Sequence, residues 1–171
     1  MKTLFLDRDG VINRERPGDY VKTRAEFIFL PGVLEALAIL NKHFDRIFIV
    51  SNQRGVGKGI MTRETLDDIH AWMLQEINAA GGRIDKIYVC TDINDHSFHR
   101  KPNTGMALQA ANDFPEVILT ESIMVGNSLS DMEFGKNADM QTVLVGDKYA
   151  EKNVPLADYF FKDLLAFAQH L

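Results

Sequence analysis

The chain has 171 residues, of which 46% are hydrophobic and 25% are charged, and its formal net charge is -5. A chain of this length can bury one ordinary hydrophobic core, so we expect a single globular domain over residues 1–171. The acidic balance argues against nucleic acid as the main partner, because phosphate backbones select basic surfaces, but it permits a small anionic ligand.

The sequence shows no pattern of a secreted or membrane-spanning protein. Charges interrupt the apolar residues of the opening MKTLFLDRDG, and no later run approaches the roughly 18 apolar residues of a membrane span. The one cysteine, Cys90, cannot form an internal disulfide, which is typical of a reducing compartment. We therefore expect a cytoplasmic protein with no membrane partner. A monomer is compatible with the sequence, which does not determine the oligomeric state.

Segments typical of strands alternate with segments of helical periodicity. The expected strands are short and rich in β-branched residues: 3–7, 46–50, 86–90, 122–126 and 141–145. The expected helices are residues 32–44, 62–80, 104–114, 130–138 and 161–171. Buried strands joined by helices form a parallel sheet covered on both faces. The sequence therefore predicts a three-layer α/β/α sandwich.

The expected helix over residues 62–80 has the clearest signals. Thr62 is a suitable N-cap, and Gly81 and Gly82 follow the last periodic residues. Three histidines on expected helices are interpreted as surface residues rather than ligands: His43, His70 and His170. The longest irregular stretches, residues 14–25 and 91–103, are the expected source of substrate specificity.

Polar side chains follow four of the expected strands directly. They are Asp7 and Asp9; Ser51, Asn52 and Gln53; Arg100 and Lys101; and Asn127 and Asp131. The carboxyl ends of parallel strands meet at one edge of the sheet, where ligands of α/β folds bind. We therefore expect these groups to converge on one site.

This set of groups is suited to phosphoryl transfer. A carboxylate can attack phosphorus and form an acyl phosphate, and a divalent cation such as Mg²⁺ tempers the repulsion between the two anions. Residues two apart on extended backbone face the same way, so Asp7 and Asp9 are expected to face the substrate while Arg8 points elsewhere. We predict that Asp7 is the nucleophile. Asp9, crowded by phosphate charge, is pushed toward its protonated form and acts as acid and then base.

Four motifs in order along the chain resemble those of the haloacid dehalogenase superfamily of phosphatases. They are LFLDRDGVIN, SNQRGVGKG, RKPNTGM and MVGNSLSDMEFGKNA. The signatures DRDGVIN, SNQ and RKP are similar to a narrower group, the D-glycero-D-manno-heptose 1,7-bisphosphate and histidinol phosphatases. The resemblance implies a Rossmann-like fold without a large cap domain. It also implies an Mg²⁺-dependent phosphoric monoester hydrolase that acts on a small phosphorylated sugar in the synthesis of lipopolysaccharide precursors.

The resemblance also implies roles for individual residues. Ser51 and Lys101 would hold the transferring phosphate, and Asn52 or Arg100 would contact the rest of the substrate, with Gln53 beside them. The metal would be bound by Asp7, the backbone carbonyl of Asp9 and an acid of the fourth motif. At that position this chain has Asn127, an uncharged ligand that should lower the affinity for Mg²⁺. Asp131 is a further candidate ligand.

Two other binding motifs are weaker. Cys90, His96 and His99 precede the RKP motif, but the further cysteines of a structural zinc site are missing, so we expect surface histidines and no Zn²⁺. The stretch GVGKG lacks the glycine and hydroxyl positions of a nucleotide-binding phosphate loop, and it is interpreted as a flexible loop. Arg54, just before this stretch, or Lys58 within it could meet a second anionic group of the substrate.

Two alternatives to a heptose bisphosphate phosphatase remain open from the sequence. One is a phosphatase for histidinol phosphate or another sugar phosphate. The other is a phosphosugar-binding or scaffolding protein whose catalysis has decayed, a hypothesis motivated by Asn127. Retention of Asp7, Asp9, Ser51 and Lys101 argues against the second.

Overall fold

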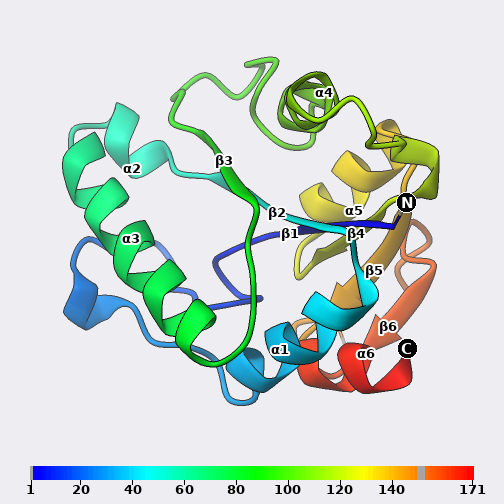
Figure 1. Cartoon of the computed structure of the whole chain (residues 1–171). Helices are drawn as coiled ribbons and strands as arrows, with labels where there is room; N and C mark the ends of the chain where they lie inside the picture. The colour runs from blue at the N-terminus through cyan, green and yellow to red at the C-terminus, as the bar shows by residue number, and fades with distance from the viewer. Residues whose placement is uncertain (1, 150–152) are drawn as a thin grey trace.

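The computed structural model describes residues 2–149 and 153–171 and is a layered α/β structure (Figure 1). The strands are β1 (Thr3–Leu6), β2 (Arg46–Asn52), β3 (Lys86–Cys90), β4 (Ile123–Gly126), β5 (Gln141–Val145) and β6 (Tyr159–Phe161). The helices are α1 (Val33–His43), α2 (Arg54–Gly57), α3 (Arg63–Ala79), α4 (Gly105–Asp113), α5 (Leu129–Asn137) and α6 (Leu164–His170). Two 3₁₀ turns, η1 (Arg24–Glu26) and η2 (Leu119–Glu121), complete the elements of the described ranges.

All six strands pair in parallel, in the order β3-β2-β1-β4-β5-β6. Alternate residues of a strand face opposite sides of a sheet, and β1 illustrates the result. Leu4 and Leu6 belong to the core beneath α1, α3 and α6, whereas Phe5 belongs to the core beneath α4 and α5. The predicted three-layer sandwich is confirmed. No helix in the described residues is long and apolar enough to cross a membrane.

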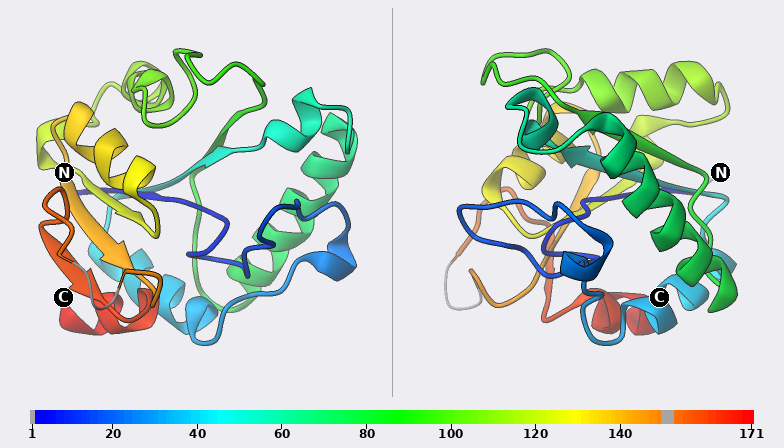
Figure 2. Two further views of the ribbon diagram at one scale, coloured as in Figure 1. Left: turned by 180° about the vertical axis from the view of Figure 1, so that it is seen from behind. Right: turned by 90° about the vertical axis from the view of Figure 1, so that its left-hand side faces the viewer.

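The strand order reverses at β1, which lies between β2 and β4. Ligands of open α/β sheets bind beyond the carboxyl ends of the strands at such a switch point. The segment after β1 runs beside α3 in both views of Figure 2. The ring of Phe27 in this segment packs edge-on against Trp72 of α3, and Phe29 packs edge-on against Phe27. This segment therefore forms one wall of the region where the strands end.

Helix α3 forms as its sequence pattern predicts. The Thr62 hydroxyl accepts a hydrogen bond from the Thr65 backbone N–H at 3.1 Å and caps the first turn. After the helix ends, Gly81 adopts a φ of 90°, the left-handed backbone that glycine tolerates best.

The structure differs from the sequence prediction in two short elements. Residues 54–57, interpreted as part of a flexible loop, form the helical turn α2. Residues 159–161 add an edge strand, β6, so that the expected helix over residues 161–171 begins only at Leu164. Both elements are too short to show a hydrophobic period, which is why the pattern did not identify them.

Candidate active site

A cavity of about 240 Å³ opens at the carboxyl ends of β1, β2 and β4. Its floor contains predicted site residues from distant parts of the sequence: Asp7, Asp9, Asn52, Gln53, Lys101, Asn127 and Asp131. Residues 15–21 of the segment after β1 form its outer wall. Pockets for drug-sized ligands are typically about 300–1,000 Å³, so this cavity suits a small polar molecule.

A tight turn after β1 presents the two aspartates. The backbone N–H of Asp7 donates to the Val125 carbonyl at 3.0 Å and extends the pairing of β1 with β4. The Arg8 carbonyl then accepts hydrogen bonds from the backbone N–H groups of Val11 and Ile12, at 3.1 and 2.8 Å. Gly10 has a φ of 90°, and a Cβ there would lie 2.0 Å from the Asn127 amide nitrogen. The turn therefore requires glycine for both backbone conformation and space.

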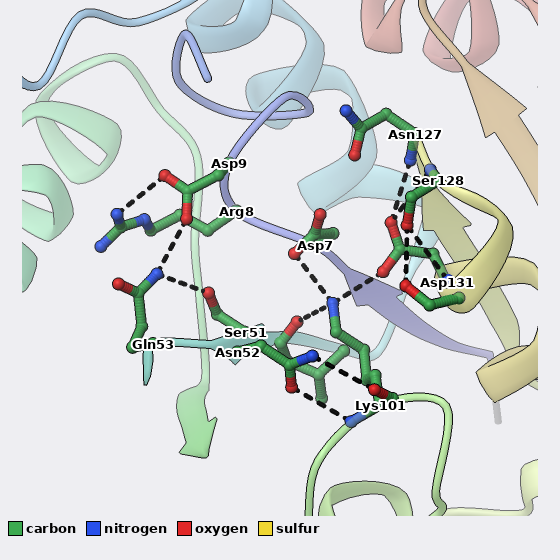
Figure 3. A network of polar contacts seen from close by, with 12 residues as sticks. Asp7, Arg8, Asp9, Ser51, Asn52, Gln53, Lys101, Asn127, Ser128 and Asp131 are labelled. Carbon is green, nitrogen blue, oxygen red and sulfur yellow. Dashed lines mark hydrogen bonds and ion pairs between the residues drawn. The ribbon is translucent and has the colours of Figure 1, made fainter. Parts of the chain in front are cut away.

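Lys101 is the central cation of the site (Figure 3). Its Nζ lies 2.8 Å from Asp7 Oδ1, 2.7 Å from Asp131 Oδ1 and 2.9 Å from the Val50 carbonyl oxygen. Burial alone would lower the pKa of Lys101, but the charges of Asp131 and Asp7 outweigh it and raise that pKa. Asn52 holds the Lys101 backbone by accepting from its N–H at 3.1 Å and donating to its carbonyl at 3.3 Å.

The Asp7 side chain is only 13% exposed, and its carboxyl group shares the Lys101 ammonium with a second carboxylate, that of Asp131. Desolvation, followed by the charge of Asp131, raises the pKa of Asp7, and Lys101 offsets this only in part. A bound divalent cation would favour the ionised form that a nucleophile requires.

Three oxygen positions converge beside Asp7 and fit a magnesium ion. The Asn127 side-chain atom that faces the β1 turn lies 3.2 Å from Asp7 Oδ2 and 3.3 Å from the Asp9 carbonyl oxygen. If the Asn127 amide oxygen occupies this position, three hydrogen-bond acceptors face one another, and a cation between them would stabilise the arrangement. If the amide is turned by 180°, its nitrogen instead donates hydrogen bonds to Asp7 Oδ2 and to the Asp9 carbonyl oxygen. Carboxylate, amide and backbone oxygens are the donor set that Mg²⁺ prefers. The residues present therefore fit the metal predicted from the sequence.

Asp131, the other candidate ligand, has different partners in the structure. Besides Lys101, its carboxylate accepts from the backbone N–H groups of Asn127 and Ser128, at 3.1 and 3.3 Å. The Ser128 hydroxyl in turn accepts from the Asp131 N–H, which completes a capping box at the start of α5. Asp131 thus fixes the fourth motif and Lys101, and a role in metal binding stays a prediction.

Asp9 points away from Lys101, toward Arg8 and Gln53 (Figure 3). Its Oδ1 accepts from Arg8 Nη2 at 2.8 Å and from Asn13 Nδ2 at 2.9 Å, and its Oδ2 accepts from Gln53 Nε2 at 2.8 Å. Burial raises the pKa of Asp9, but the Arg8 charge and these hydrogen bonds outweigh it and lower that pKa. These neighbours therefore hold Asp9 ionised, and the protonated form expected from the sequence requires the added negative charge of a phosphate.

Three predicted contact residues do not line the cavity. The Ser51 side chain is buried, and its hydroxyl accepts from Gln53 Nε2 at 2.8 Å. Arg54 and Arg100 lie outside and share the carboxylate of Asp95: Arg54 hydrogen-bonds to it, and Arg100 Nε is 3.8 Å away. Sequence position alone could not separate residues of the cavity wall from those behind it.

The remaining sequence expectations concern cysteine and histidines. Cys90 is a buried free thiol whose Sγ lies 4.0 Å from Ser97 Oγ, and no cluster of three or more His, Cys, Asp or Glu side chains suited to a metal occurs in residues 2–149 and 153–171. His43 and His170 are exposed, as predicted. The prediction for His70 is wrong. This side chain is 7% exposed, because it lies on the buried face of α3, where its ring nitrogen pairs with Arg8.

Comparison with known proteins gives consistent matches. Residues 98–166 match the HAD-hydrolase-like family model. The chain is 39% identical over 142 residues to D-glycero-beta-D-manno-heptose-1,7-bisphosphate 7-phosphatase of Rhodopseudomonas palustris, covering 78% of this chain and 77% of the relative. It is 40% identical over 135 residues to D-glycero-alpha-D-manno-heptose-1,7-bisphosphate 7-phosphatase of Mycobacterium tuberculosis, with coverage of 78% and 71%.

One solved structure matches nearly the whole fold. It is D,D-heptose 1,7-bisphosphate phosphatase from B. bronchiseptica complexed with magnesium and phosphate. The TM-score is 0.90 at 33% sequence identity, and the match covers 99% of this chain and 97% of the other. The similarity thus extends from the motifs to the complete arrangement of strands and helices.

Proposed function

The chain belongs to the haloacid dehalogenase superfamily, in the group of phosphoric monoester hydrolases named heptose 1,7-bisphosphate 7-phosphatases, and from this premise we propose that it removes the 7-phosphate of a D-glycero-D-manno-heptose 1,7-bisphosphate. The observation that carries the proposal is the convergence of the Asp7 carboxylate, the Lys101 ammonium and the Asn127 side chain in one small polar cavity. We propose that residues 1–171 act as one catalytic domain, which the single six-stranded sheet supports.

Asp7 is the proposed nucleophile. Its Oδ2 lies beside the Asn127 side chain, and its Oδ1 accepts a hydrogen bond from Lys101. In the first step a carboxylate oxygen of Asp7 forms a bond to phosphorus, while the bond from phosphorus to the sugar oxygen breaks. That oxygen takes a proton from Asp9, which the negative charge of the substrate phosphate has driven into its protonated form. In the second step Asp9 takes a proton from water, which attacks the aspartyl phosphate and releases inorganic phosphate. Lys101 stabilises the charge on the non-bridging oxygens.

A magnesium ion is the proposed cofactor, held by Asp7, the Asp9 carbonyl and Asn127. When bound, it neutralises negative charge on the carboxylate and phosphate that must approach each other. The fit of the oxygen cluster described above supports this assignment. Ser51 is proposed as a phosphate contact that requires its hydroxyl to turn from Gln53 toward the cavity.

The second phosphate of the substrate is proposed to bind near α2. Arg54 and Arg100 both pair with Asp95, whose carboxylate occupies the position of an anion between two guanidinium groups. One nitrogen of each guanidinium, Arg54 Nε and Arg100 Nη1, is buried and has no hydrogen-bond partner among the described residues. Displacement of Asp95 by a phosphate would satisfy these donors. Lys58, which lies over the ring of Tyr20, is a further cation on this side.

The proposed setting is the cytoplasm, in the synthesis of heptose precursors of lipopolysaccharide. The buried free thiol of Cys90 is consistent with a reducing compartment. The proposed partner is the small phosphorylated sugar alone, without nucleic acid or membrane.

A substrate screen tests the proposed function. With Mg²⁺ present, we expect phosphate release from heptose 1,7-bisphosphate with a kcat/KM at least about tenfold above that for histidinol phosphate, because only the bisphosphate engages both cation sites. Both anomers are assayed separately, since the two relatives above differ in the anomer that they are named for. A preference for histidinol phosphate, or no turnover of any sugar phosphate, would contradict the proposal.

We predict that Asn127→Asp strengthens magnesium binding by about tenfold, because a second anionic oxygen then faces the cation beside that of Asp7. Without Mg²⁺ the same change crowds carboxylates and lowers the melting temperature, so the Mg²⁺-dependent rise in melting temperature should increase. Calorimetric titration and thermal melts with and without Mg²⁺ measure both effects.

Asn78→Asp, on the exposed face of α3, is the matched control and should leave both quantities unchanged. Equal Mg²⁺ affinities of the wild type and Asn127→Asp would exclude Asn127 as a ligand. If only Asn127→Asp turned over substrate, the wild type would be a phosphosugar-binding protein instead.

A further inference from the structure

Arg8 is a fully buried cation within reach of the proposed acid–base group. Its side chain is 0% exposed, and its Nη2 lies 2.8 Å from Asp9 Oδ1. This is the one ion pair that Arg8 makes in the part of the chain that the structure describes. Burial of an unpaired guanidinium costs several kcal/mol, so Arg8 and Asp9 hold each other in place.

His70 is the second partner of Arg8. Arg8 Nη1 lies 2.9 Å from His70 Nε2, and the two residues are 62 positions apart in the sequence. A guanidinium group can only donate hydrogen bonds, so Nε2 must accept and the imidazole must carry its proton on Nδ1. Burial, followed by the charge of Arg8, lowers the pKa of His70 to about 3, in agreement with a neutral ring.

The orientation of the Arg8 guanidinium depends on its hydrogen bond with His70. Beyond Asp9 and His70, the guanidinium lies 5.7 Å from the ring centre of Phe27, a contact that constrains its plane only weakly. Arg8 Nε has no hydrogen-bond partner among the described residues. Without an acceptor at position 70, the guanidinium loses one of its two hydrogen-bond partners, and the Arg8 contact with Asp9 Oδ1 is no longer fixed, although Asn13 and Gln53 still hold the carboxylate.

We propose that His70 is a positioning residue for the acid–base step: as a neutral acceptor it fixes Arg8, and Arg8 fixes the carboxylate of Asp9. The inference rests on the proposed function, because it assigns to Asp9 the proton transfer to the leaving oxygen. A buried histidine on α3, outside the sequence motifs, thus acts on catalysis through a chain of two hydrogen bonds. His70 itself does not line the cavity that contains Asp9.

Leaving-group dependence distinguishes this role from a merely structural one. The parameter kcat/KM includes steps up to departure of the leaving group, and proton donation matters for alkoxide leaving groups far more than for p-nitrophenolate. For His70→Leu we expect kcat/KM to fall by about tenfold to hundredfold on heptose bisphosphate and by less than about threefold on p-nitrophenyl phosphate. His70→Gln places an amide oxygen near the position of Nε2 and should restore most of the loss.

The control variant is Ile77→Ala, which removes a buried side chain two turns further along α3. It should destabilise the protein to a similar extent as His70→Leu, measured by thermal melting, and leave the ratio of the two kcat/KM values unchanged. Equal losses on both substrates for His70→Leu, or no rescue by His70→Gln, would overturn the inference while leaving the phosphatase function intact.

A spectroscopic measurement tests the hydrogen bond without any assay of turnover. In ¹⁵N NMR of the wild-type protein, we expect His70 to show the neutral tautomer protonated on Nδ1 across neutral pH. An imidazolium ring at pH 7, or a ring protonated on Nε2, would overturn the inference. A wild type with the expected tautomer but no phosphatase activity would instead contradict the proposed function.

Discussion

Asp7→Asn should reduce phosphatase activity by about 10³-fold or more, because it removes the oxygen nucleophile rather than a contact to the substrate. An amide can still accept the hydrogen bond from Lys101 Nζ, which lies 2.8 Å from Asp7 Oδ1, so the site should keep its shape. Because burial and Asp131 raise the pKa of Asp7, a neutral side chain is tolerated here, and the melting temperature should not fall. Loss of activity with retained stability is the expected signature.

The measurement combines steady-state kinetics with detection of the covalent intermediate. Acid quenching of the wild type during turnover, followed by mass spectrometry, should reveal one added phosphoryl group on the peptide that contains Asp7. Asp67→Asn provides the control, because Asp67 is an exposed aspartate of α3 that pairs only with Arg63 in the described part of the chain. If Asp7→Asn retained more than about a tenth of the wild-type activity, direct attack by Asp7 would be excluded.

Lys101→Met should have the second large effect, on both stability and activity. The lysine side chain is 3% exposed and pairs with Asp131, which is 1% exposed. Removal of one partner of a buried ion pair leaves an uncompensated charge and costs about 3–5 kcal/mol of unfolding free energy. For a protein of this size each kcal/mol lowers the melting temperature by about 2–4 °C. Loss of the cation should also reduce kcat by about 10²–10³-fold, as for other groups that stabilise transition-state charge.

Two further variants identify the cause of this loss. Lys86→Met removes the lysine of an exposed ion pair with Asp113 and should cost no more than about 1 kcal/mol. The double variant Lys101→Met, Asp131→Asn removes the more buried of the two carboxylates that Lys101 neutralises, so it should be more stable than Lys101→Met while remaining inactive. A melting temperature of Lys101→Met equal to that of the wild type would show that the buried pair contributes nothing to stability.

Some properties of the site follow from local sequence alone. The apolar strands of five residues and the capped, periodic helices predict an α/β sandwich, because hydrophobic period and end signals are properties of adjacent residues. The polar residues that follow these strands then predict a site at the carboxyl edge of the sheet. Asp7 and Lys101, 94 positions apart, are brought within 2.8 Å as this reasoning requires.

Other features depend on contacts between elements whose relative position no local pattern contains. β6 is a strand of three residues that forms because β5 offers an edge to pair with, and α2 is a single turn after β2. The sequence pattern placed His70 on the surface because histidine is polar. The buried guanidinium of Arg8, in the turn after β1, supplies the hydrogen-bond partner that makes burial of His70 favourable.

The sequence by itself thus indicated the alternation of strands and helices and the edge of the sheet where polar residues gather, and it made Asp7 the candidate nucleophile. Only the tertiary structure decided which polar residues reach the cavity. It buries Ser51 beside Gln53, pairs Arg54 with Asp95 and directs Asp131 to Lys101. The physical reason is that a buried polar group must find a hydrogen-bond partner, and in a folded chain that partner can come from a distant segment that only packing brings into reach.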